Sequence, residues 1–592
     1  MTDETYAEYL TDILETCERM DISEERMDQL REMLSYPEMV YSTPENVFRK
    51  SNFSFLEKDI IFSILFCWMN PYTAEYRSEA LVLQAITDGK VQYKQLFLTR
   101  EQLMAAVKSV RQYRVATEMT ECELADTLKK LVTTERIIEV DSVRFGRILY
   151  LRTDWVLPQT IVNQIRKICT AKPKMQFLVR DIRKELMAYN QKTAPPLSAE
   201  QLMAVKGALT QKVSIITGGP GTGKTQIAKA ILQVINQLDR KCKVLCIAPT
   251  GMAAYNLTQV GGARAKTVHA AYYDARSKGQ KYDCIIIDES SMLNLAIFRD
   301  FLTTLDWDVR IIFLGDINQL PCFDEGYLFR DILDCGIIPV FRLTQIYRQA
   351  AGSGIIKAAK MIADGEIPEI SSSDFEVFKY GAIHKRDLTH IVSDIIARMD
   401  ELIREGYRRE DIQVLSPSRE FACQLNLALQ DHFNPAPGIA GASFRVGDPV
   451  VFLQNKYDLG LRNGFLGTVT AVDSVGRVTV AYANGQTIQH NPKDYELLDL
   501  AYCLTVHKSQ GSQYPVVIVP CFEVLGLKLL SRNLIYTAIT RAQEKAILLT
   551  TDTAFAYAIA RNEAAERHSV MDQLLRNEKA YEAVKHVDID SA

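Results

Sequence analysis

A chain of 592 residues with 47% hydrophobic and 24% charged residues can build several globular domains. Its net charge of −4 excludes a general basic coat, so any nucleic-acid surface has to be a local groove. Twelve cysteines without a C-x-x-C pair exclude a zinc cluster or a disulfide framework and are typical of reduced thiols in the cytoplasm.

The N-terminal region, residues 1–95, is predicted to be helical. The start Met1–Glu4 lacks the build of a signal peptide, and the apolar run Ile60–Met69 covers about half of a membrane crossing. Residues 1–45 carry thirteen acidic and three basic residues, a balance that phosphate would repel. We therefore expect this acidic arm to face solvent or, alternatively, to dock a protein partner, and we expect no membrane contact.

Residues 96–194 are predicted to form a winged-helix-like module and a linker. Helices are expected around Glu101–Gln112 and Glu121–Val132, followed by a hairpin with strands Arg136–Val140 and Phe145–Leu151. Two helices and a β-wing are typical of winged-helix folds, which bind DNA when a basic helix enters a groove. The second helix here is not basic, which favours a structural or protein-docking role.

Beyond Pro195-Pro196, short apolar strands alternate with helices, a rhythm that predicts an α/β fold with parallel sheets. Strands are expected at about 213–217, 244–248, 284–288, 311–315 and 411–415. Residues 443–500 differ, because their short alternating strands indicate a small inserted barrel. Asn484-Gly485 within this segment is a hairpin-turn signal.

A glycine-rich loop, Gly218–Lys224, lies between the apolar run Val213–Ile216 and a helical segment and is followed by Thr225. This is the phosphate-loop pattern in the strand–loop–helix context that it requires. The glycines let backbone N–H groups point at phosphate oxygens, and the following helix adds positive potential. Lys224 can then reach the β/γ-phosphates and the Thr225 hydroxyl can bind Mg²⁺, which predicts a nucleoside triphosphate site.

Two carboxylates close a buried strand downstream of this loop. Asp288 is placed to hold Mg²⁺ jointly with Thr225, and Glu289 to orient and deprotonate an attacking water. Gln319 can report the presence of a γ-phosphate through its amide. Arg348 and Arg541, distant in sequence, could converge on one triphosphate and stabilise the charge of the transition state.

Eight motifs then occur in the order that superfamily 1B helicases of the RecD-like branch use, and the chain resembles that family over about residues 197–560. They are T-G-G-P-G-T-G-K-T (217–225), A-P-T-G-M-A-A (248–254), K-T-V-H (266–269), I-I-D-E-S-S-M (286–292), G-D-I-N-Q-L-P (315–321), Y-R-Q (347–349), L-T-V-H-K-S-Q-G (504–511) and Y-T-A-I-T-R-A (536–542). The resemblance implies ATP and Mg²⁺ between two RecA-like domains, an SH3-like β-barrel insertion, and 5′→3′ movement on single-stranded DNA.

The domain ranges that the resemblance implies are 195–340 for the first RecA-like domain, 341–442 and 501–575 for the second, 443–500 for the insertion and 576–592 for a tail. It assigns Lys224, Asp288, Glu289, Gln319, Arg348 and Arg541 to catalysis. It assigns nucleotide binding to Gln201, as adenine reader, to Gly219, Pro220, Gly221, Thr222, Gly223, Lys224, Thr225 and Gln226, and to Tyr347, as a stacking ring. It assigns contact with the DNA strand to Pro249, Thr250, Thr267, His269, Asn463, Thr505, His507 and Lys508.

The interval Ala270–Asp283 is shorter than the β-hairpin that family members often use as a strand-separating pin. The short interval weakens the expectation of robust duplex unwinding and leaves ATP hydrolysis and translocation intact. Two alternatives stay open beside an autonomous helicase: a motor subunit of a larger nuclease or recombination complex, and a motor that acts on RNA.

Overall fold

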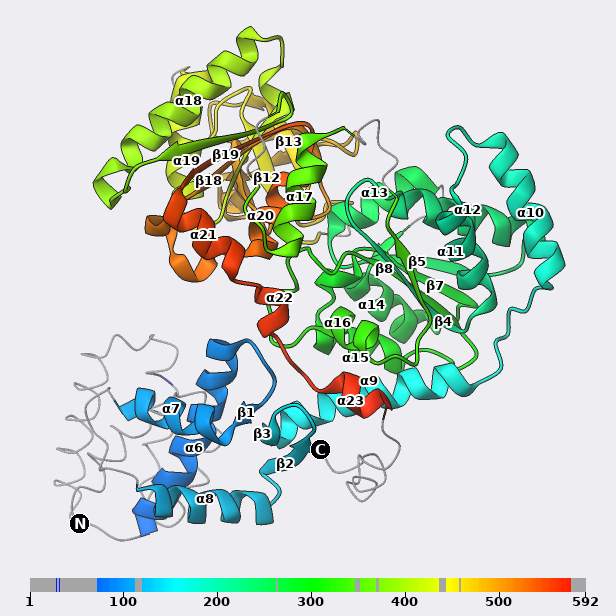
Figure 1. Cartoon of the computed structure of the whole chain (residues 1–592). Coiled ribbons are helices and arrows are strands. Elements are labelled where there is room, and N and C mark those ends of the chain that lie inside the picture. Colours follow the sequence, from blue (N-terminus) through cyan, green and yellow to red (C-terminus); the bar gives the residue numbers. More distant parts are fainter. Residues whose placement is uncertain are drawn as a thin grey trace. The chain divides into compact units, whose positions relative to one another are not determined.

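The computed structural model describes residues 72–111, 120–261, 265–345, 352–368, 372–435, 443–456 and 459–576, with Asp28 and Arg31 (Figure 1). The predicted acidic arm (apart from these two residues), the apolar run Ile60–Met69 and the tail beyond Arg576 lie outside the described residues, as do Tyr347 and Arg348. The chain forms two compact units. One ends at Pro158 and includes His568–Gln573, and the other runs over Gln159–Arg567 and resumes at Leu574.

In its described residues, the first unit combines the helices α6, α7 and α8 with a three-stranded antiparallel sheet of order β1-β3-β2. Its elements are α6 (Tyr72–Tyr93), β1 (Leu98–Thr99), α7 (Arg100–Arg111), α8 (Glu121–Thr133), β2 (Ile137–Ser142) and β3 (Gly146–Leu151). Helix α8 begins at a capping box in which Thr120 and Glu123 bond each other's backbone N–H, a sequence signal that fixes its start. The two helices and the hairpin are therefore confirmed, whereas the name winged helix stays a prediction.

A segment near the C-terminus completes this unit. The Tyr150 hydroxyl donates to the Ser569 carbonyl at 2.8 Å, and the Phe145 and His568 rings lie 4.6 Å apart. The prediction that residues 501–575 belong wholly to the second sheet domain is wrong for His568–Gln573. Helices α9 (Arg152–Thr170) and α23 (Met571–Arg576) each cross the boundary between the units.

The second unit contains a six-stranded, all-parallel sheet of order β6-β5-β7-β8-β4-β9. Its strands are β4 (Val213–Gly218), β5 (Val244–Ala248), β6 (Lys266–Thr267), β7 (Cys284–Ile287), β8 (Arg310–Gly315) and β9 (Val340–Leu343). Its helices are α10 (Val179–Lys192), α11 (Ala199–Thr210), α12 (Lys224–Leu238), α13 (Gly251–Gly261), α14 (Val268–Lys278), α15 (Leu295–Thr303) and α16 (Leu328–Asp334).

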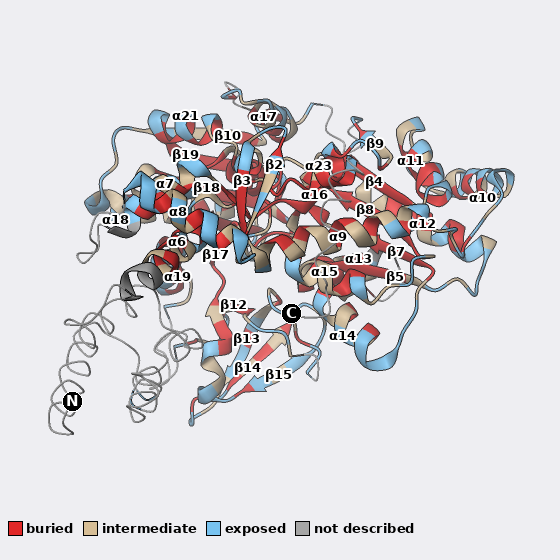
Figure 2. Cartoon of the chain, turned by 90° about the horizontal axis from the view of Figure 1, so that it is seen from below, coloured by how far each residue is buried: buried red, intermediate tan, exposed pale blue. Residues whose placement is uncertain are grey.

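Helices cover both faces of this sheet, which explains why its central strands are continuous apolar runs (Figures 1 and 2). Ile216 and Ile286 point into a core formed with α10–α13. On the opposite face Phe313 of β8 meets Phe298 of α15, with ring centroids 5.9 Å apart. The strands predicted near 213, 244, 284 and 311 are confirmed.

The domain boundary predicted at Pro195 lies too late in the chain. Helix α10 buries Ile182, Leu186 and Tyr189 in the core of the first sheet domain, so this domain begins before the proline pair. Its far boundary is also displaced, because β9 pairs with β4 and the sheet continues through Leu343 rather than ending at residue 340.

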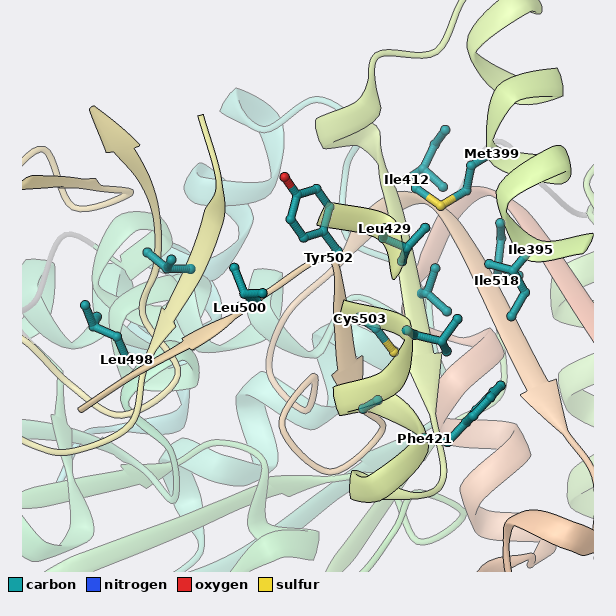
Figure 3. Close-up of a cluster of buried hydrophobic side chains, with 14 of the residues drawn as sticks. Ile395, Met399, Ile412, Phe421, Leu429, Leu498, Leu500, Tyr502, Cys503 and Ile518 are labelled. Atoms are coloured by element: carbon teal, nitrogen blue, oxygen red, sulfur yellow. The ribbon is translucent and has the colours of Figure 1, made fainter. Parts of the chain in front are cut away.

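A second all-parallel sheet has the order β10-β19-β18-β11-β17. Its strands are β10 (Phe375–Tyr380), β11 (Ile412–Ser416), β17 (Cys503–Thr505), β18 (Tyr514–Cys521) and β19 (Ala542–Thr551). Its helices are α17 (Gly354–Asp364), α18 (Leu388–Arg404), α19 (Arg419–Phe433), α20 (Arg532–Ile539), α21 (Asp552–Ala560) and α22 (Glu563–Glu566). Helices α18 and α19 cover one face, where Met399 and Phe421 pack beside Ile412 and Ile518 (Figure 3), and α17, α20 and α21 cover the other.

The segment between β11 and β17 contributes a five-stranded antiparallel sheet of order β15-β14-β13-β12-β16. Its strands are β12 (Pro449–Phe452), β13 (Leu466–Val472), β14 (Val478–Tyr482), β15 (Thr487–His490) and β16 (Leu498–Leu500). The predicted Asn484-Gly485 turn joins β14 to β15, with Gly485 at a left-handed φ of +84°. The inserted sheet is thus where the sequence predicts it, and its identification as an SH3-like barrel stays a prediction.

None of the helices in the described part of the chain is both long and apolar enough to cross a bilayer.

Candidate functional site

The phosphate loop connects the end of β4 to the start of α12. Gly223 is the residue before α12 and has a φ of +83°, a conformation that favours glycine. A β-carbon at this position would lie 2.4 Å from the Gln201 Nε2 atom, so both the backbone and the space require glycine. The Thr222 hydroxyl donates to the Gly219 carbonyl at 2.8 Å and stabilises the curl of the loop from inside.

The Lys224 side chain lies along this loop. Its Nζ donates to the carbonyls of Gly218 and Gly219, at 2.5 and 3.1 Å. These bonds hold the ammonium beside the cavity into which the loop opens. A phosphate oxygen can take the place of either carbonyl.

Asp288 and Glu289 follow β7 at the carboxyl edge of the first sheet. Glu289 has a φ of +50°, a left-handed conformation that costs a residue with a side chain about 1–3 kcal/mol. Its Oε2 atom is buried and has no hydrogen-bond partner among the described residues. Burial raises the pKa of Asp288 to about 7, and the charge of Glu289 adds to this effect. Strained backbone and crowded carboxylates at a strand end are typical of functional sites.

Gln319 and Arg541 complete the site from two different sheets. Gln319 follows β8, and its buried Oε1 atom has no hydrogen-bond partner in the part of the chain that the structure describes. Arg541 follows α20 in the second sheet domain, where its guanidinium donates to the carbonyls of Thr537 at 3.2 Å and Ser512 at 3.3 Å. These bonds fix the arginine while it still reaches the cavity.

One cavity of about 300 Å³ lies between the two sheet domains of the second unit. It is lined by Pro195, Gly219, Pro220, Gly221, Gly223, Lys224, Thr225, Gln226, Asp288, Glu289, Gln319, Gln513, Thr540 and Arg541. A larger cavity of about 680 Å³ shares Thr225, Asp288, Glu289 and Arg541 with it and extends to Tyr189 of α10 and Leu257 of α13. Lys224 and Arg541 therefore face the same space.

The chemistry of this cavity fits a magnesium nucleotide. Asp288 and Thr225 both line it and supply the hard oxygen ligands that Mg²⁺ prefers. A divalent cation would neutralise the carboxylate of Asp288, and a water in the cavity would donate to the Oε2 atom of Glu289.

Contacts between the two sheet domains surround this cavity, and sequence reasoning assigned no role to the residues that make them. The Tyr536 hydroxyl donates to the Oδ2 atom of Asp316 at 2.8 Å, and both side chains are buried. The Leu320 N–H donates to the Thr537 hydroxyl at 2.8 Å, and the Gln510 side chain donates to the Leu320 carbonyl at 3.0 Å. Helix α20 thus holds the loop that carries Gln319 and also precedes Arg541. In the sequence, the only sign that these contact residues matter is that all of them lie within the quoted motifs.

Tyr536 and Asp316 join the two domains beside the cavity through one shared hydrogen bond. Their substitutions should therefore not act independently on the ATP turnover rate. We expect the variants Y536F and D316N to be non-additive in the ATP turnover rate, with a coupling of about 0.5–3 kcal/mol in a double-mutant cycle. Steady-state ATPase of the two single variants and of the double variant measures it. The pair Y557F and D316N serves as the control and should be additive, because Tyr557 lies on the exposed side of α21. Additive effects for Y536F and D316N would contradict this coupling.

Gln201 does not line either cavity. Its Oε1 accepts the Ser198 N–H at 3.0 Å in a capping box of α11, and its Nε2 donates to the Thr222 carbonyl at 2.9 Å. The side chain therefore braces the phosphate loop, and its adenine contact stays a prediction. The neighbouring Glu200 binds the backbone N–H of Thr344 at 2.7 Å, on the segment that leads to Tyr347 and Arg348.

The predicted DNA residues form two groups. Thr250 lies at the start of α13, where its hydroxyl accepts the Ala253 N–H, and the neighbouring Thr267 caps α14 in the same way. Strand β6 pairs with β5 so that Thr267 lies beside Ala248, which places both threonines at one sheet edge, with Pro249 between Ala248 and Thr250. His269 is exposed on α14. The interval Ala270–Asp283, predicted to be too short for a strand-separating hairpin, is thus mostly part of helix α14.

The second group follows β17 in the other sheet domain. The Thr505 hydroxyl accepts the Lys508 N–H at 3.3 Å, and His507 lies between these two residues in the sequence. Asn463 of the inserted segment approaches the first group, because a β-carbon on Gly251 would lie 3.0 Å from the Asn463 carbonyl. The structure thus brings the Asn463 backbone close to Gly251, the residue after Thr250.

Comparison with known proteins finds similarity to helicases. The AAA domain family model matches residues 196–385, and the UvrD-like helicase C-terminal domain model matches residues 500–549. The ATP-dependent RecD2 DNA helicase of Deinococcus radiodurans is 33% identical over 401 residues, covering 65% of this chain and 54% of that protein. The chain is thus similar to RecD-like helicases. The match thus spans about half the length of the Deinococcus relative.

A second RecD-like relative, the RecBCD enzyme subunit RecD of Mycolicibacterium smegmatis, is 26% identical over 451 residues, covering 68% of this chain and 78% of that subunit. A structure of two coordinating Pif1 helicases at forked duplex DNA aligns with 20% identity and a TM-score of 0.42, over 65% of this chain and 97% of that one.

Proposed function

We propose that this protein is an ATP-dependent DNA helicase or translocase that moves 5′→3′ along single-stranded DNA. The observation that carries the proposal is the common cavity of Lys224 and Arg541, which come from separate parallel-sheet domains. A triphosphate bound there would contact both domains at once, and its hydrolysis would release that link. A cytoplasmic location remains a prediction.

The residues of the cavity suit hydrolysis of the γ-phosphate. Lys224 and the loop N–H groups would bind the phosphates, and Glu289 would orient the attacking water and accept its proton. Gln319 would report the γ-phosphate, while Arg541 would stabilise charge that develops on it. Magnesium, held by Asp288 and Thr225, would neutralise the phosphate oxygens.

Movement requires that the DNA strand be held without reading its bases. The hydroxyls of Thr250, Thr267 and Thr505 and the ammonium of Lys508 are groups that bind a sugar–phosphate chain of any sequence. Their division between the two sheet domains would let the strand be passed from one domain to the other as the ATP cavity closes and opens.

We expect single-stranded DNA to stimulate the ATPase, because the same two domains would bind both ligands. The logarithm of the DNA affinity should fall linearly with the logarithm of salt concentration, by about 0.7 for each phosphate contacted. ATPase assays with oligodeoxythymidylate at several salt concentrations measure both effects. An ATPase rate that does not respond to DNA would refute a DNA-driven motor. Strand displacement from 5′- and 3′-tailed duplexes then tests the direction.

A second candidate is a motor subunit with little unwinding of its own. It is favoured by the RecBCD subunits among the relatives and by the helix α14 in place of a strand-separating hairpin. Native mass measurement of the protein purified from its own cells separates the two, because a subunit would carry a stoichiometric partner. Parallel binding assays with oligoribonucleotide test the remaining possibility of an RNA substrate.

A further inference from the structure

Phe323 is an exposed aromatic residue beside the motor motifs. It follows G-D-I-N-Q-L-P (315–321) by two positions, and 75% of its surface is exposed. Single apolar residues are common on protein surfaces, so the exposure of this ring alone assigns it no role. This residue had no role in the predictions from sequence.

The loop that carries Phe323 is anchored by the buried side chain of Arg567. The Arg567 guanidinium, whose side chain is only 1% exposed, donates to the carbonyls of Cys322 and of Asp324, the latter at 2.5 Å. Glu563 accepts from the same guanidinium at 2.7 Å and fixes it in turn. The backbone is therefore anchored on both sides of Phe323, so the ring is presented at a defined position on the surface.

The ring of His507 is the aromatic neighbour of Phe323. The two ring centroids lie 6.0 Å apart at an interplanar angle of 72°, an edge-to-face arrangement. His507 belongs to the second sheet domain, between Thr505 and Lys508, whereas Phe323 follows β8 in the first. The pair thus lies at the boundary between the domains, next to residues proposed to hold the DNA strand.

We propose that Phe323, with His507, forms a stacking platform for unpaired bases of single-stranded DNA. This inference rests on the proposed function and adds to it, because the other predicted contacts hold only the sugar–phosphate chain. Every base has a π-face, so an aromatic platform holds bases without selecting a sequence, as a translocating motor requires. A rigid, exposed phenyl ring supplies such a surface.

The test is equilibrium binding of fluorescein-labelled oligodeoxythymidylate to the full chain. We expect F323A to weaken binding by about 5- to 150-fold, the effect of losing one stacked base. F323L should show a similar loss, since leucine keeps the apolar volume without a π-face. F323W should retain binding, and its fluorescence should be quenched by DNA. The dependence of affinity on salt should keep its slope in all three variants, because no phosphate contact is removed.

W307A is the matched control, because Trp307 is another exposed aromatic residue, 50% exposed, near the amino end of β8 and thus at the opposite edge of the sheet. It should bind DNA like the wild type. If the wild type binds DNA and F323A binds equally well, the platform is refuted while the motor stands. If the wild type fails to bind DNA, the proposed function itself fails. If F323A keeps DNA binding and instead loses a co-purifying protein, the ring belongs to a protein interface.

Discussion

The K224A variant is expected to lose ATP turnover by at least about 10²–10³-fold, the loss seen when one group that stabilises transition-state charge is removed. The ammonium already lies on the loop, bonded to the Gly218 and Gly219 carbonyls, and a bound phosphate would be its natural partner. Alanine leaves the loop N–H groups in place, so nucleotide binding should weaken while hydrolysis is lost. Steady-state ATPase with saturating DNA, together with binding of a fluorescent nucleotide, measures the two effects separately.

Folding should be little affected by this change. Lys224 is partly exposed and its bonds to the loop carbonyls can be replaced by water, so the free energy of unfolding should change by no more than about 1.5 kcal/mol. K241A, at an exposed lysine between α12 and β5, is the control and should hydrolyse ATP like the wild type. Normal turnover in K224A would mean that the cavity between the two sheets is not the ATPase site.

The parts of the site that the sequence predicts well are those encoded locally. Runs such as Cys284–Ile287 are apolar throughout because both faces of the strand are covered. The two acidic residues that follow such a run therefore mark the end of the strand. A glycine-rich turn between a strand and a helix likewise defines the phosphate loop without knowledge of the rest of the chain. Lys224, Asp288 and Glu289 could therefore be located in one cavity from spacing and chemistry.

What the sequence does not encode locally is which distant segments meet. Tyr536 and Asp316 are 220 positions apart, and neither side chain has a spacing that identifies the other. The sequence predicts a linker where helix α10 lies, whereas the apolar side of this helix packs against α12. His568 and Ser569 follow the second sheet domain in the chain but pack in the first unit, by contacts with Phe145 and Tyr150. Such pairings depend on tertiary packing, which overrides the order of the chain.

Arg541 should be the residue whose loss separates binding from chemistry most clearly. An arginine that stabilises the charge of a transferred phosphoryl group contributes about 10³–10⁵-fold to the turnover rate. R541A is therefore expected to lower kcat by that amount with a smaller change in the KM for ATP. R541K should recover little of this loss, because lysine lacks the planar fork that spans the Thr537 and Ser512 carbonyls and the cavity.

The arginine also bonds buried carbonyls, so a purely structural role has to be distinguished from a catalytic one. Arg532, at the start of the same helix α20, donates to the carbonyls of Ile559 and Ala363 and does not line the cavity. R532A should lower the thermal midpoint as R541A does, yet hydrolyse ATP at a rate near that of the wild type. Equal losses of kcat in R532A and R541A would show that the arginine only supports the fold. A selective loss in R541A would instead place the second sheet domain in the chemical step, which is the coupling that a two-domain motor requires.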